Sequence, residues 1–147
     1  MNMKIRRKVL AVLSVIIFSM FVTAVVPVRA ATDSSYLSRY KKLERKCKKK
    51  FKYNAPQQVM NRESAEEYQL WDKELNYVYK SIYSKLTVAR QKELKKSELA
   101  WIKKRDRKAK KSAGEMEGGT LYPLIYNNTM TKLTKQRIKW LIEKYTL

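Results

Sequence analysis

Glycine and proline, the residues that interrupt helices most strongly, are rare in this chain. The 147 residues include three glycines and three prolines. Beyond Pro27 they mark two breaks, one at Asn54-Ala55-Pro56 and one at Gly114 and Gly118-Gly119, while Pro123 falls in the first turn of the helix that follows. No long stretch alternates between apolar and polar residues with the period of a strand. The sequence therefore predicts an all-α fold.

Apolar residues recur at intervals of three and four in three long segments, which is typical of one face of a helix. We expect helices over Gln57–Leu86, Val88–Lys111 and Leu121–Tyr145. The first would be about 45 Å long, and a helix of that length needs partners to bury its stripe. Residues 87–91 form either a tight turn or a kink, because no glycine or proline marks them. The predicted architecture is an antiparallel bundle of about three long helices.

A short and very basic segment, Tyr36–Lys52, precedes the first break. Its apolar residues are spaced to line one side of a helix: Tyr36, Tyr40, Leu43, Cys47 and Phe51. One interpretation is a solvated helix that packs this thin stripe on the bundle. The other is a basic amphipathic helix that binds an anionic surface. We describe residues 31–55 as a basic linker or amphipathic helix and residues 56–147 as the helical domain.

The first 30 residues have the order of a secretory signal peptide. Four cations occur in the segment from Lys4 to Lys8. An apolar run then covers Val9–Val26, and Val28-Arg29-Ala30 resembles a cleavage site. We expect a leader helix that is removed, so that the mature chain begins near Ala31 outside the cytoplasm. The alternative is an uncleaved membrane anchor, because the run is at the short end of the range of about 17–25 residues that spans a bilayer.

The charge of the chain predicts attraction to polyanions. It contains 34 Lys and Arg against 13 Asp and Glu, a net charge of +21, and loss of the leader's five cations would leave +16. Outside a cell the available polyanions are wall polymers, phospholipid headgroups in peripheral contact, and stray nucleic acid, whose binding would be incidental. The candidate residues for binding a polyanion or a partner are Lys41, Lys42, Arg45, Lys46, Lys48, Lys49, Lys50, Lys103, Lys104, Arg107, Lys108, Lys110 and Lys111.

The residue inventory argues against an enzyme. There is no histidine, the usual general base and the commonest metal ligand, and Cys47 is the single cysteine. We therefore predict no catalytic residue, no cofactor and no metal, and the chain cannot form an internal disulfide. Cations surround Cys47 in sequence, which would favour its thiolate. The protein is then either a monomer or a Cys47-linked dimer.

Several short motifs occur in an order that resembles one known family. They are Met60-Asn61, Tyr68, Asp72, Leu75-Asn76 and Tyr79; then Glu98, Trp101-Ile102 and Arg105-Asp106; then Gly118-Gly119-Thr120, Thr134, Arg137 and Leu141. Residues 57–141 resemble the LprI-type lysozyme inhibitor domains. The resemblance implies a small secreted or periplasmic helical domain that binds without a cofactor, and for some members it implies inhibition of lysozyme.

The chain departs from that family pattern in three ways. Members usually carry cysteine where this chain has Ser64, Ala109 and Thr129, and glutamine where it has Glu98. A disulfide is worth about 2–4 kcal/mol, so packing has to replace it. The third departure is the charge, because animal lysozymes are also basic and like charges repel at an interface.

We expect structural roles for ten residues, namely Tyr68, Trp71, Asp72, Leu75, Asn76, Tyr79, Trp101, Arg105, Asp106 and Trp140. The three tryptophans act as core anchors or, alternatively, as ligand platforms. Arg105 either stacks on Trp101 or pairs with a carboxylate of a facing helix, such as Asp72 or Glu74; the alternative is that it binds a ligand. Asn76 serves a helix–helix hydrogen bond or a partner contact. The sequence thus predicts a secreted, non-catalytic binding domain that resembles LprI-type inhibitors; the alternative is a cationic envelope protein that binds wall polymer or membrane.

Overall fold

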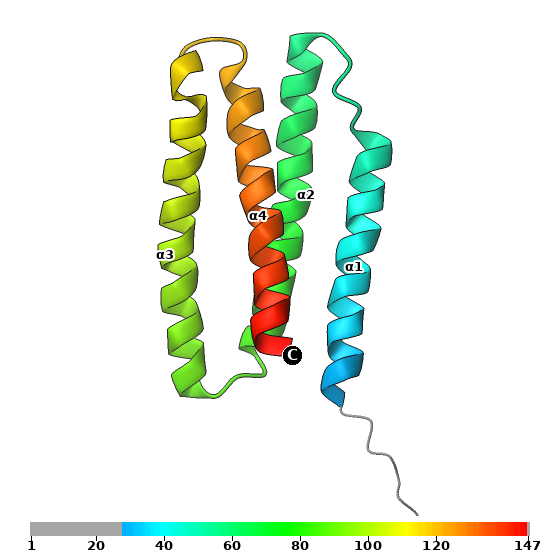
Figure 1. Cartoon of the computed structure of the whole chain (residues 1–147), viewed down its shortest axis with the longest axis vertical. Coiled ribbons are helices and arrows are strands. Elements are labelled where there is room, and N and C mark those ends of the chain that lie inside the picture. The colour runs from blue at the N-terminus through cyan, green and yellow to red at the C-terminus, as the bar shows by residue number, and fades with distance from the viewer. Residues whose placement is uncertain (1–27, 147) are drawn as a thin grey trace, which may run out of the picture.

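The computed structural model describes residues 28–146 and folds them into four long helices (Figure 1). They are α1 (Val28–Lys50), α2 (Gln57–Tyr83), α3 (Val88–Ala113) and α4 (Tyr122–Thr146), with a short 3-10 turn, η1, at Gly114–Met116. No strand occurs within residues 28–146, so the all-α prediction is confirmed. The predicted leader helix, except for its last three residues, lies outside the described residues.

Successive helices run in opposite directions, and α4 is the central helix of the bundle. Figure 1 shows α1 and α3 on the two outer flanks, with α2 and α4 between them. α4 packs against each of the other three helices, whereas α2 and α3 contact each other little. This arrangement leaves an open strip of surface between α2 and α3. None of the helices in the described range is long and apolar enough to cross a membrane.

The basic helix is a full member of the bundle. It begins at Val28 rather than Tyr36, so the structure has four long helices where about three and a basic extension were expected. Its stripe faces inward, because Tyr36, Tyr40, Cys47 and Phe51 are all buried. Arg39 also donates two hydrogen bonds to the Glu74 carboxylate of α2, at 3.0 and 2.8 Å. The interpretation that the stripe packs on the bundle therefore agrees with the structure.

Two connections depend on backbone conformations with positive φ. Tyr53, between α1 and α2, has φ 52°, and its side-chain hydroxyl donates to Glu67 Oε2 at 2.6 Å. Gly118, between η1 and α4, has φ 76°, which a residue with a Cβ rarely adopts. The boundary near residue 87 is a turn: α2 ends at Tyr83 rather than Leu86, and α3 starts at Val88.

Cys47 corrects one expectation. The thiol lies on the buried face of α1, where burial, with a smaller contribution from Glu67, raises its pKa to about 11. The prediction of a thiolate favoured by neighbouring cations is therefore wrong, because most of those lysines point to solvent while the sulfur points inward. With 3% of Cys47 exposed, a disulfide to a second chain would require α1 to move away from the bundle.

The centre of the core is built around Trp71. This side chain has no exposed surface, and its ring contacts that of Tyr40 in α1 with centroids 4.9 Å apart. Leu94, Ile138 and Leu141 are also fully buried and bring α3 and α4 into the same core. All four helices therefore contribute to one apolar interior.

Trp71→Ala should lower the free energy of unfolding by about 3–5 kcal/mol, because it removes a fully buried ring and leaves a cavity. Urea unfolding followed by circular dichroism measures the change. Leu121→Ala is a suitable control, since Leu121 is 40% exposed and its truncation should cost less than about 1 kcal/mol. Equal losses for the two variants would contradict the assignment of Trp71 as the anchor.

Candidate functional site

The strip between α2 and α3 forms a groove of about 450 Å³. α2 lines it with Tyr68, Asp72, Leu75, Asn76 and Tyr79, and α3 lines it with Lys95, Glu98, Leu99, Trp101, Ile102 and Arg105. The groove thus gathers most residues of the first two motif groups, the one that begins at Met60-Asn61 and the one that begins at Glu98. Seven of the lining residues were expected to have structural roles. Leu75 and Arg105 are buried, whereas the other five are half-buried or exposed, namely Tyr68, Asp72, Asn76, Tyr79 and Trp101.

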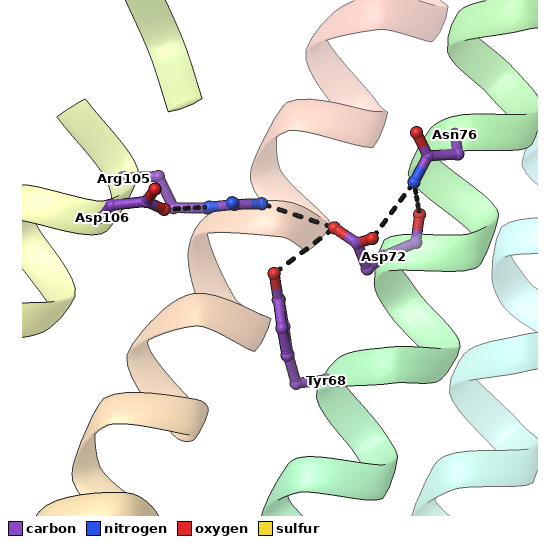
Figure 2. Close-up of polar contacts among 5 residues, drawn as sticks. All are labelled: Tyr68, Asp72, Asn76, Arg105 and Asp106. Atoms are coloured by element: carbon purple, nitrogen blue, oxygen red, sulfur yellow. Dashed lines mark hydrogen bonds and ion pairs between the residues drawn. The ribbon is translucent and has the colours of Figure 1, made fainter. Parts of the chain in front are cut away.

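A polar network crosses the groove and is centred on Asp72 (Figure 2). Its Oδ1 accepts hydrogen bonds from the Tyr68 hydroxyl and from Arg105 Nη1, each at 3.4 Å. Arg105 Nε donates to Asp106 Oδ1 at 2.9 Å. The Asn76 amide donates to the backbone oxygen and to Oδ2 of Asp72, at 2.9 and 3.1 Å. Asn76 therefore bonds within its own helix and remains exposed to a partner.

Arg105 connects this network to the aromatic side chains of the groove. Its guanidinium carbon lies 4.9 Å from the Trp101 ring centroid and 5.8 Å from that of Tyr68. The residue is 8% exposed, so its charge is neutralised by Asp72 and Asp106 in a largely buried setting. Glu74, the other carboxylate considered for Arg105, pairs with Arg39 instead. Arg105 holds α3 to α2 where direct packing is sparse.

Below the groove, a second ion pair joins α3 to α4. Arg137 Nε donates to Glu98 Oε2 at 2.9 Å, and Arg137 Nη2 donates to Ser97 Oγ at 3.0 Å. The guanidinium lies 4.0 Å from the Trp140 ring centroid. Burial raises the pKa of Glu98, although Arg137 acts in the opposite direction. In the sequence, Arg137 is recognisable only as part of a motif, and nothing there predicts its pairing with Glu98.

The two tyrosines Tyr68 and Tyr79 offer hydrogen-bond donors in the groove. Burial raises the pKa of Tyr68 to about 12 and also raises that of Tyr79. Both hydroxyls therefore stay protonated at neutral pH and can donate hydrogen bonds. Among residues 28–146, no group of three or more His, Cys, Asp or Glu side chains could hold a metal ion.

Other residues singled out in the sequence lie away from the groove. Trp71 is in the core beside Tyr40, and Trp140 is half-buried over Arg137. The Asn61 amide donates to the Thr120 carbonyl at 2.8 Å and so ties the start of α2 to the turn before α4. Ser64 and Ala109 are fully buried, and Ser64 Oγ accepts a hydrogen bond from Asn127 Nδ2 at 3.2 Å. These small residues allow close packing of α2 and α3 against their neighbours.

The thirteen candidate polyanion-binding cations are all exposed, in the C-terminal parts of α1 and α3. Both helices end at the same end of the bundle, on opposite flanks (Figure 1). Lys50 pairs with Glu66 at 2.9 Å, and Lys48 approaches Glu44 at 4.0 Å. The other eleven have no carboxylate partner in the described part of the chain. The structure thus places them in two separate basic surfaces rather than in one site.

Glu98→Gln should leave the protein at least as stable at pH 7. A carboxyl with a raised pKa binds its proton more tightly in the folded state, so its contribution to stability falls as the pH rises from about 4.5 through the folded pKa. The glutamine stays neutral and can still accept a hydrogen bond from Arg137. Melting temperatures between pH 4 and 8 should therefore show a smaller decline with pH for the variant. A loss of more than about 2 kcal/mol at pH 7 would contradict this prediction and would mean that the ion pair is strongly stabilising.

Comparison with known proteins agrees with the motif pattern. A family model described as "Lysozyme inhibitor LprI" matches residues 47–141, about two thirds of the chain. The match begins at Cys47 in α1, so it includes the end of the basic helix as well as α2, α3 and most of α4. Searches of curated proteins and of solved structures returned no match. The chain belongs to the LprI lysozyme inhibitor family.

Proposed function

We propose that this protein is an extracytoplasmic, non-catalytic binding protein that uses the α2–α3 groove to bind a lysozyme or a lysozyme-like wall hydrolase. Membership of the LprI family supports an inhibitor-type domain. The observation that carries the proposal is the groove itself, where motif residues from two helices lie together and are open to solvent. The signal-peptide order of residues 1–30 supports export to the compartment where such hydrolases act.

The composition of the groove suits a protein partner. Interfaces are enriched in aromatic residues and arginine, and hot spots cluster around apolar anchors. Here Leu99 is 53% exposed at the rim, and Tyr68, Tyr79 and Trp101 line the interior. The lining charges are also balanced, because two carboxylates, Asp72 and Glu98, face two cations, Lys95 and Arg105. A polyanion would gain little from such a surface, whereas a protein with matching polar and apolar groups would gain contact area.

The charge of the chain narrows the class of target. Without the leader its net charge is +16, which repels strongly basic lysozymes at long range. Screening acts beyond about 8 Å at physiological ionic strength, so this repulsion is largest in dilute salt. We therefore propose a neutral or acidic muramidase as the target.

Leu99→Asp should weaken inhibition of a sensitive muramidase by about tenfold or more, because it places a charge at an apolar anchor of the groove. Rates of wall lysis with a panel of muramidases of different isoelectric point provide the measurement. Val88→Asp is the matched control: it lies on the same helix, is 68% exposed and does not line the groove. If no muramidase in the panel is slowed, or if both variants lose activity equally, the proposal is wrong.

A second candidate function is attachment to anionic wall polymer through the two basic surfaces. It is favoured by the exposure of all thirteen cations and by the lack of carboxylate partners for eleven of them among the described residues. Such binding would be electrostatic and would weaken steeply with salt.

Neutralising Lys41, Lys42, Lys46 and Lys49 to glutamine should reduce retention on purified cell walls at low salt, and the difference should vanish as salt increases. Sedimentation of the protein with wall fragments at two salt concentrations measures this. The control changes Lys73, Lys80, Lys92 and Lys96, which carry the same total charge and are also exposed. Equal losses would show that net charge, rather than the α1 surface, is responsible.

A further inference from the structure

A second hollow, with no residue in common with the α2–α3 groove, lies between α1 and α4. Its volume is about 450 Å³, within the range of about 300–1,000 Å³ that is typical of small-ligand sites. The lining residues are Tyr40 and Glu44 of α1, Tyr53 of the following connection, and Asn128, Thr131, Lys132, Lys135, Gln136 and Lys139 of α4. Neither the family motifs nor the proposed lysozyme contact uses this hollow.

Thr131 is the unusual residue in this wall. It is 8% exposed, and its hydroxyl oxygen is buried without a hydrogen-bond partner among the described residues. A hydroxyl offers one donor and two acceptor sites, and burying it unsatisfied is unfavourable. Thr131 lines the hollow, and rotation about its Cα–Cβ bond would turn the hydroxyl toward a ligand there, which would supply the missing partner.

Other polar side chains that are open to solvent line the same hollow. The side-chain amides of Asn128 and Gln136 are exposed, and each can both donate and accept hydrogen bonds. Lys132 and Lys139 are also exposed, and neither has a carboxylate partner within residues 28–146. Hydroxyls and amides placed in this way match the hydroxyl and acetamido groups of a sugar.

The charges in the hollow favour an anion. Three ammonium groups face one carboxylate, Glu44, which is engaged by Lys135 at 3.5 Å and by Lys48 at 4.0 Å. Lys135 is further held over the Trp71 ring, 4.8 Å from its centroid. Glu44 is thus compensated within the protein, and Lys132 and Lys139 remain for a ligand.

Aromatic rings complete the lining. Tyr53 is half-buried, and its hydroxyl is occupied by Glu67, so its ring is the part that remains for a ligand. Tyr40 is buried beneath Lys139, whose ammonium lies 5.1 Å from the ring centroid. The negative face of an aromatic ring attracts weakly positive C–H groups such as those on the face of a sugar ring.

We propose that the α1–α4 hollow binds a sugar unit that carries a carboxylate or a phosphate, as in an anionic envelope glycan. Thr131, Asn128 and Gln136 bind its hydroxyl and amide groups, while Lys132 and Lys139 bind its acidic group. A lipid surface fits less well, because a flat membrane would contact the rim of the hollow and leave the polar groups of its wall unpaired. The proposal does not depend on lysozyme binding by the α2–α3 groove.

Titration of the purified, ¹⁵N-labelled protein with single sugars tests the ligand class. N-acetylmuramic acid and N-acetylglucosamine 1-phosphate represent the two acidic sources, and neutral N-acetylglucosamine and inorganic phosphate are the controls. We expect amide shifts in residues 128–139 with one or both acidic sugars, and weaker binding of each control. If inorganic phosphate binds as tightly as the sugar phosphate, or if none of the probes shifts these residues, the proposal is overturned.

Two variants separate the site from the fold. Thr131→Val should reduce affinity for the acidic sugar by about fivefold, the value of one hydrogen bond, while the melting temperature stays equal or rises. Lys132→Gln together with Lys139→Gln should remove most of the preference for acidic over neutral sugar. The matched pair Lys92→Gln and Lys96→Gln, on α3, should leave binding unchanged. Unchanged affinity in the Thr131 variant, or equal losses in the two lysine pairs, would overturn the proposal.

Discussion

The packing of α4 against the other three helices is the interaction on which the rest of the structure depends. α4 supplies Ile138 and Leu141 to the core, both without exposed surface, and it provides the guanidinium of Arg137 that pairs with Glu98. The single cysteine is buried and free, so the bundle is held by side-chain burial and polar contacts instead of disulfides. Because α3 is attached chiefly through α4, the surface between α2 and α3 stays partly open, and a second hollow remains where α1 and α4 meet. Both candidate sites follow from this arrangement.

Much of the fold could be predicted from apolar spacing, because a stripe of large side chains at intervals of three and four has few alternatives to a helix. The prediction was wrong about where α1 starts and about its length, because α1 is a long helix of the bundle rather than a short extension. A thin apolar stripe flanked by lysines does not reveal how much of it is buried. Cys47 shows the same limit. Its neighbours in sequence are cations, but on a helix residues at i±1 point elsewhere, and the buried contacts decide the thiol pKa. Helix ends without glycine or proline, such as that of α2 at Tyr83, could be placed only within a few residues.

The candidate sites were less predictable, because they depend on how separate helices are aligned. The partnership of Arg105 with Asp72 could be anticipated, since both occur in recognisable motifs and their helices were expected to be neighbours. The pair formed by Glu98 and Arg137 could not, because it depends on the register of α3 against α4 across 39 residues of sequence. Nor does the sequence indicate that the Thr131 hydroxyl has no partner within residues 28–146, because threonine in a helix often bonds the carbonyl one turn earlier.

The carboxylates are distributed in a way that separates two kinds of surface. Glu74, Glu98 and Glu44 are engaged by cations of neighbouring helices, and Asp72 and Asp106 are engaged by Arg105. Because all of these carboxylates except Asp106 are used between helices, most lysines on the outer faces of α1 and α3 have no ion-pair partner among the described residues, and the field around the protein is strongly positive. The α2–α3 groove is an exception, since its own charges cancel. Long-range attraction therefore comes from the outer faces, while selectivity in the groove has to come from shape, apolar contact and hydrogen bonding. A positively charged partner would be repelled by this field before it reached the groove. The net charge of the protein and the chemistry of the groove therefore act together to restrict what this bundle can bind.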